Sequence, residues 1–141
     1  GEAVQTPINF FALTRLTFEV PNDRQEHSVE HNCTVPEDNT RILLFGPHMH
    51  EWGTHIEIEK VDAAGVVHPL HQVEQWRADY RDLPPVARYF DDPLVLNASD
   101  TVRLRCTWSN DLDRSLRFPK EMCAVYGYFL APSGQNWICA E

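Results

Sequence analysis

The chain has 141 residues, which is enough for one domain with a useful hydrophobic core. It contains 12 lysines and arginines and 21 aspartates and glutamates. The resulting net charge of −9 argues against a nucleic-acid partner, because binding to phosphates needs a basic surface. No apolar stretch approaches the about 20 residues that cross a bilayer, and no signal peptide opens the chain, so the sequence predicts no membrane span.

The hydrophobic pattern predicts β-strands throughout the chain. Apolar and polar residues alternate, as expected of strands with one buried face, over residues 15–20, 55–59 and 101–108. The third of these runs places Cys106 on its buried face, and a more continuous apolar strand, rich in aromatic residues, follows at 124–130.

Turn-forming residues separate these runs. They occur at residues 21–23, 64–65, 84–85, 97–100 and 132–134. The best helical candidate, residues 72–81, is short and precedes a pair of prolines. Many short strands at this spacing are typical of antiparallel sandwiches and jelly rolls. The sequence therefore predicts one all-β domain over residues 1–141, a two-sheet antiparallel sandwich of the jelly-roll kind that is stabilised by disulfides.

Four cysteines, Cys33, Cys106, Cys123 and Cys139, allow three pairings if all of them are oxidised. None of them forms the Cys-x-x-Cys spacing of a zinc ribbon or a thioredoxin site. Disulfides persist in oxidising compartments. We therefore expect two disulfides in an exported protein of the periplasm, the extracellular space or the secretory lumen.

A His-Met-His triplet, His48 to His50, ends an apolar run and is the strongest chemical signal in the chain. Residues two apart on a strand share a face, so the two imidazoles can bind one metal ion. Met122, in a Glu-Met-Cys triplet far downstream, can supply a third ligand. Because a thioether is soft and favours Cu(I), this donor set predicts one copper ion that cycles between Cu(I) and Cu(II).

These motifs resemble those of a known family. The Pro-His-Met-His-x-x-Gly segment (residues 47–53), the Cys106 strand and the Glu-Met-Cys triplet (residues 121–123) occur in the same order as in the C-terminal domain of the copper type II, ascorbate-dependent monooxygenases. That family includes peptidylglycine α-hydroxylating monooxygenase and dopamine β-monooxygenase. The resemblance covers most of the chain, from Phe11 to Cys139.

The resemblance implies two packed antiparallel sheets and a mononuclear copper on His48, His50 and Met122. At this copper dioxygen would bind and substrate C–H bonds would be hydroxylated, with ascorbate or another reductant supplying electrons. It also implies that Tyr126 contacts the substrate. The family's cysteine pattern implies the disulfides Cys33–Cys139 and Cys106–Cys123, the second of which would clamp the backbone that presents Met122.

The chain departs from the family pattern at two substrate contacts and in its extent. Peptide-hydroxylating members carry an arginine where this chain has Gly46 and an asparagine where it has Ala124. Family enzymes also hold a second copper on three histidines, including a His-His pair, in a preceding domain. This chain has no His-His pair, so we expect that domain to be absent and electrons to come from a partner domain, a partner protein or a small reductant.

His55 is the alternative third ligand. With the His-x-His pair it resembles a cupin metal motif, which would suit iron, manganese or zinc. However, the glutamate of that motif is missing, and the strand pattern places His55 with Glu57 and Glu59 on a solvated face. The pairs His27/His31 and His68/His71 are interpreted as surface histidines.

The sequence leaves two functional hypotheses. In the first, the domain is a monooxygenase-like module that uses dioxygen and a small-molecule or peptide substrate. In the second, it is a non-catalytic exported protein for copper binding and delivery, for which no electron-transfer domain is required. Whether the chain is an enzyme by itself stays open at this stage.

Overall fold

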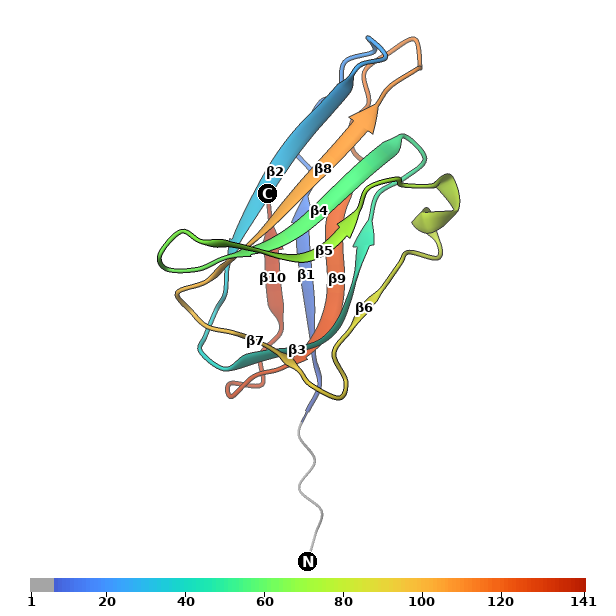
Figure 1. Ribbon diagram of the computed structural model, residues 1–141. Coiled ribbons are helices and arrows are strands. Elements are labelled where there is room, and N and C mark those ends of the chain that lie inside the picture. The colour runs from blue at the N-terminus through green and yellow to red at the C-terminus, as the bar shows by residue number, and fades with distance from the viewer. Residues whose placement is uncertain (1–6) are drawn as a thin grey trace, which may run out of the picture.

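A computed structural model describes residues 7–141 as a sandwich of two β-sheets, which confirms the expected fold class (Figure 1). Within this range no helix has the length and apolar character needed to cross a membrane. The elements are β1 (Asn9–Arg15), β2 (Glu26–Thr34), β3 (Thr40–His48), β4 (Gly53–Val61), β5 (Val67–Val73), the 3-10 helix η1 (Ala78–Arg81), β6 (Ala87–Arg88), β7 (Leu94–Leu96), β8 (Thr101–Ser109), β9 (Cys123–Leu130) and β10 (Trp137–Ala140).

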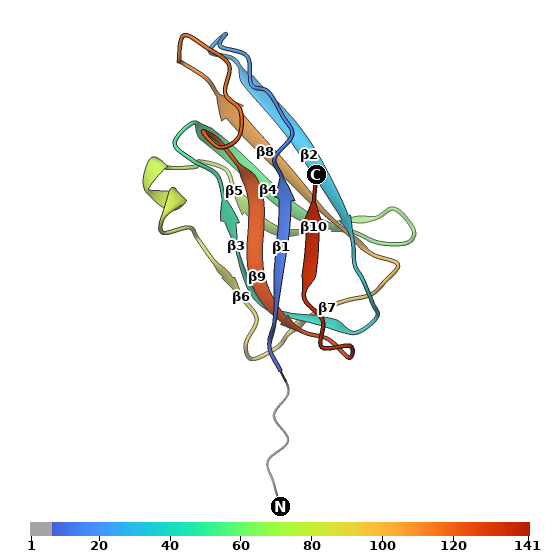
Figure 2. The ribbon, with the colours of Figure 1, turned by 180° about the vertical axis from the view of Figure 1, so that it is seen from behind.

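One sheet has six strands and the other has four. The first is ordered β10-β1-β9-β3-β6, with β7 also pairing with β3, and the second is ordered β2-β8-β4-β5. Figure 2 views the molecule from the side of the six-stranded sheet. All strand pairs are antiparallel except β1 and β10, which run parallel. The sandwich is therefore antiparallel, as expected, apart from this one pair at the sheet edge.

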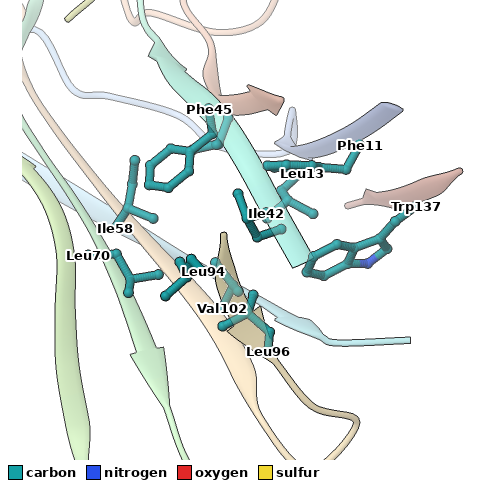
Figure 3. A pocket seen from close by; sticks show the side chains of 11 residues that line it. Phe11, Leu13, Ile42, Phe45, Ile58, Leu70, Leu94, Leu96, Val102 and Trp137 are labelled. Atoms are coloured by element: carbon teal, nitrogen blue, oxygen red, sulfur yellow. The ribbon is translucent and has the colours of Figure 1, made fainter. Parts of the chain in front are cut away.

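The core lies between the sheets, where both contribute their inward-facing residues. Figure 3 shows side chains from the six-stranded sheet meeting those of the four-stranded sheet. The alternation read from the sequence holds on β4 and β8, because every second residue is buried. These residues are Ile56, Ile58, Val102, Leu104, Cys106 and Trp108. Burial of large apolar side chains, worth about 1.5–3 kcal/mol each, stabilises the sandwich.

Two sequence-based element predictions need correction. Residues 16–19 keep an alternating burial pattern but form no strand, because the backbone N–H groups of Leu16 and Thr17 both donate to the carbonyl of Glu141. The strand instead begins earlier, at Asn9. The helical candidate is also wrong over most of its length. Gln72 and Val73 pair with β4, and only Ala78–Arg81 forms a single 3-10 turn.

Both disulfides connect one sheet to the other. Cys33 on β2 bonds to Cys139 on β10, and Cys106 on β8 bonds to Cys123 on β9. The pairing implied by the family resemblance is therefore confirmed. Each bridge runs between the layers, so together they hold the two sheets in one relative position.

Removing the disulfides should destabilise the protein in a definite order. Chain-entropy arguments give about 4–5 kcal/mol for the bridge that closes a separation of 106 residues and about 3 kcal/mol for the one that closes 17 residues. We therefore expect Cys33→Ala/Cys139→Ala to lower the free energy of unfolding more than Cys106→Ala/Cys123→Ala. Urea denaturation without reductant measures both variants. The opposite order would contradict the loop-length argument.

Candidate metal centre

The two histidines of the triplet lie together where β3 ends. Residues alternate across the strand, so Met49 points into the core with 0% exposure, while His48 and His50 share the other side. Their ring centroids are 5.1 Å apart. His50 is buried and His48 is half-buried. The pair is thus held at the edge of the protein interior.

Strand pairing brings the Met122 segment to the same place. β9 runs antiparallel to β3, with Gly46 opposite Tyr126 and His48 opposite Ala124. The ladder ends two residues short of His50 and Met122, whose backbone N–H groups both donate to Oε1 of Glu121. Because paired residues face the same side of a sheet, Tyr126 shares the face that carries His48. Three sequence-predicted residues, His48, His50 and Met122, therefore converge on one end of the six-stranded sheet.

A buried carboxylate fastens these segments to one another. Glu121 is 0% exposed, and its Oε1 accepts the backbone N–H groups of His50 at 2.6 Å and Met122 at 2.9 Å. Its Oε2 accepts the N–H of Trp52 at 3.2 Å. Burial raises the pKa of this carboxyl, and the backbone N–H groups of His50 and Met122 oppose that shift. Glu121 therefore links the turn after β3 to the segment that presents Met122.

Hydrogen bonding fixes the tautomer of His50. Its Nδ1 lies 2.8 Å from the carbonyl oxygen of Lys120. A carbonyl only accepts, so Nδ1 carries the proton and Nε2 keeps its lone pair. A backbone carbonyl on the far ring nitrogen is a common way to orient a ligating histidine. The Trp76 indole N–H also donates to the carbonyl of His50, at 3.0 Å.

His48 is kept neutral by its surroundings. Burial lowers the pKa of its imidazole, and the charges of His50 and Arg81 add to this shift, which a backbone hydrogen bond at Arg81 and the charge of Asp82 only partly oppose. The neutral form is the one that ligates a metal. Arg81 itself, on η1, is paired with Glu51 through a 2.6 Å contact between Nη1 and Oε1.

Tyr126 borders the histidines. Its ring centroid is 6.0 Å from that of His48, and burial raises the pKa of its phenol, which therefore stays protonated. An open hollow of about 230 Å³ begins at these two residues. The hollow gives a molecule in solvent a route to His48.

His55 does not join this group. It lies on β4, next to the inward-facing Ile56, and lines a separate hollow on the other sheet. Its Nε2 is 2.9 Å from Oε1 of Glu57, the neighbour expected from the strand pattern.

The other histidines divide into two kinds. His27 and His68 are partly exposed, and each pairs with an aspartate, as expected of surface residues. His71, also expected at the surface, is half-buried, and its Nε2 donates to the carbonyl of Pro85 at 2.8 Å. His31, expected at the surface, is instead 2% exposed. It lies with Val29 and Cys33 on the inward face of β2, which contacts β10. Its Nε2 donates to the carbonyl of Cys139 at 2.9 Å.

His31 also belongs to a compact group of possible metal ligands. Within residues 7–141, His31, Cys33 and Cys139 have donor atoms within 4.8 Å of one another. The two sulfurs are bonded to each other in a disulfide, so neither is a thiolate ligand. In this oxidised state the group is part of the disulfide packing.

Sequence reasoning found the three candidate ligands but missed the groups that hold them. Glu121 was visible beside Met122, yet a glutamate in a loop is most often solvated, and only the fold shows it buried. The carbonyl of Lys120 has no signal in the sequence at all, because every residue carries such a group.

Comparison of the chain with protein-family models found no match, and comparison with curated proteins found none either. The interpretation of this centre therefore rests on its residues and their geometry.

Replacing the buried carboxylate should loosen the centre. In Glu121→Gln one acceptor becomes an N–H₂ group that faces a backbone N–H, so we expect the free energy of unfolding to fall by about 1–3 kcal/mol. Chemical denaturation of the apoprotein measures the change. Glu51→Gln is the matched control, because this residue is exposed and its surface pair with Arg81 is worth about 1 kcal/mol or less. Equal losses in both variants would contradict the role given to Glu121.

Proposed function

We propose that this chain is a mononuclear copper-binding domain that activates dioxygen for hydroxylation of an organic substrate, and that His48, His50 and Met122 are the ligands. The observation that carries the proposal is the convergence of two imidazoles, 5.1 Å apart, with a thioether segment joined to them through Glu121. Two nitrogens and one soft sulfur suit copper in both of its common oxidation states.

The residues present fit such an ion. Nε2 of His50 is available because Nδ1 is bound to Lys120, and the lowered pKa of His48 favours its neutral, ligating form. Copper held by three protein ligands would supply redox chemistry at a position left open for dioxygen. The protein's own part is to hold the ligands, to exclude water on the Met49 side and to admit a substrate on the Tyr126 side.

One feature favours an oxygen-activating role over copper delivery. An open hollow adjoins His48 and is lined by apolar and aromatic side chains. A delivery protein has no need of a substrate surface at its metal, whereas a hydroxylating site requires one. The two disulfides between the sheets support a location in an oxidising compartment, and we propose that the protein is exported.

The two methionines of the chain allow a sharp test of the ligand set. Met122→Leu removes the proposed sulfur ligand, and we expect Cu(I) affinity to fall at least about tenfold while Cu(II) affinity changes less. Met49→Leu is the matched control, because Met49 is buried in the core and Leu has a similar volume. X-ray absorption of the Cu(I) form should lose its sulfur signal in Met122→Leu and keep it in Met49→Leu. An unchanged sulfur signal in Met122→Leu would overturn the assignment.

The proposed reaction has its own test. Copper-loaded protein, supplied with ascorbate and a candidate substrate, should consume oxygen and form a hydroxylated product, and His48→Ala should abolish both. A holoprotein that binds Cu(I) tightly, passes it to an acceptor protein and consumes no oxygen would replace the hydroxylation proposal with copper delivery.

A further inference from the structure

The two outer faces of the sandwich differ in chemistry. The four-stranded sheet presents charged side chains, among them Glu30, Glu57 and Arg105. The six-stranded sheet and the residues beside β1 and β6 present large apolar ones instead, with Ile8 63%, Phe10 36%, Phe90 59% and Tyr128 47% exposed. A contiguous exposed apolar area on one face indicates a binding surface.

These apolar residues form a groove that leads to the candidate metal centre. The hollow of about 230 Å³ beside His48 adjoins a second hollow of about 600 Å³, and the two share Phe10, Leu44 and Tyr128. The second hollow ends at Ile8 and Phe90. The groove therefore continues from His48 along the outer face of β9, in a size range typical of small-molecule sites.

Strand register explains why the groove is aromatic. Residues at every second position of β9 face outward, so Tyr126 and Tyr128 follow one another along the groove. Phe10 on β1 lies opposite Tyr128; its ring stacks on Tyr126 with centroids 6.3 Å apart and meets Tyr128 edge-on at 6.0 Å. The three rings form a preformed apolar wall.

Among the described residues that line the groove there is no aspartate, glutamate, lysine or arginine. Its one side-chain amide, Asn136, is engaged, because Oδ1 accepts the N–H of Phe10 at 2.9 Å. Arg81, near His48, is already paired with Glu51. The chain's net charge of −9 further disfavours an anionic ligand. Nothing described in the groove would neutralise a carboxylate or an ammonium group.

We propose that this groove binds an uncharged, elongated apolar or aromatic molecule, with one end at His48, and that this molecule belongs to the substrate class of the centre. That the bound molecule is a substrate depends on the proposed function, whereas its binding in the groove does not require copper. A small molecule is favoured over a protein partner because the groove is hollowed and continuous with the candidate ligands.

Gly46 provides the means to close the groove. A side chain at this position would start 3.4 Å from Cγ2 of Val86 and 3.5 Å from Cγ of Pro84, which also line the hollow. Leucine at this position would therefore begin at contact distance and extend into the space beside Tyr126. Tyr128→Ser removes one of the aromatic rings at an exposed position, where misfolding is not expected.

The test uses the uncharged fluorescent probe 1-N-phenylnaphthylamine and the apoprotein. We expect saturable binding, with affinity reduced at least about tenfold in Gly46→Leu and about threefold or more in Tyr128→Ser. Ile138→Ser is the matched control. Ile138 is 62% exposed on β10 of the same sheet but does not line the groove, so its variant should bind like the parent. Decanol should displace the probe at least about tenfold more effectively than decanoate or decylamine.

Each outcome separates this inference from the proposed function. Copper titration of the same variants should be unchanged, and a protein that binds copper but not the probe would overturn the groove proposal alone. Probe binding without copper binding would support the groove proposal and contradict the proposed copper function.

Two further outcomes concern the nature of the ligand. Equal displacement by decanol and decanoate would contradict the proposal that the ligand is uncharged. Concentration-dependent dimerisation that Tyr128→Ser abolishes, without probe binding, would reassign the face to self-association.

Discussion

Antiparallel pairing between β3 and β9 is the constraint on which the candidate site depends. The two strands are far apart in the sequence, and their register sets which residues meet: Gly46 faces Tyr126, and His48 faces Ala124. A slip of one residue would turn every side chain of one strand to the other face. His48 and the aromatic groove share one face only because this register holds.

Two kinds of bond maintain the register of β3 and β9 near His48 and Ala124, where their ladder ends. The Cys106–Cys123 disulfide anchors the start of β9 to the opposite sheet, and the Glu121 carboxylate joins the turn after His48 to the segment before Cys123. Met49, buried between the two histidines, packs against Gly53, where an added Cβ would come within 2.8 Å of its Cε. The polar contacts orient the candidate ligands, and the contact between Met49 and Gly53 holds the backbone of the histidine pair on its core side.

Much of the fold could be predicted from the sequence, which also supplied the candidate ligands. Alternation over Ile56 and Ile58 and over the Cys106 strand is a local signal, and it located β4 and β8 correctly. The strand expected over residues 15–20 was wrong because a carbonyl at the other end of the chain, that of Glu141, takes the donors of Leu16 and Thr17.

The features of the site that could not be predicted from the sequence depend on long-range contacts. The burial of Glu121 and the carbonyl partner of His50 depend on how β3 and the segment before β9 come together. The groove arises from residues on β1, β3 and β9 and from the loop before β6, and no single segment of the sequence contains its pattern. Local periodicity shows which side chains share a face, but not which faces become neighbours.

The disulfides also bear on the order of events during biogenesis. Cys123 immediately follows Met122, and its partner lies on the opposite sheet, so the position of the thioether depends on a covalent bond that forms only under oxidation. A nascent chain in a reducing environment would possess the same three donor residues without their fixed arrangement. In the proposed centre, oxidation of this cysteine pair would therefore come before metallation, and the thiol balance of the compartment would set how many chains could acquire the ion.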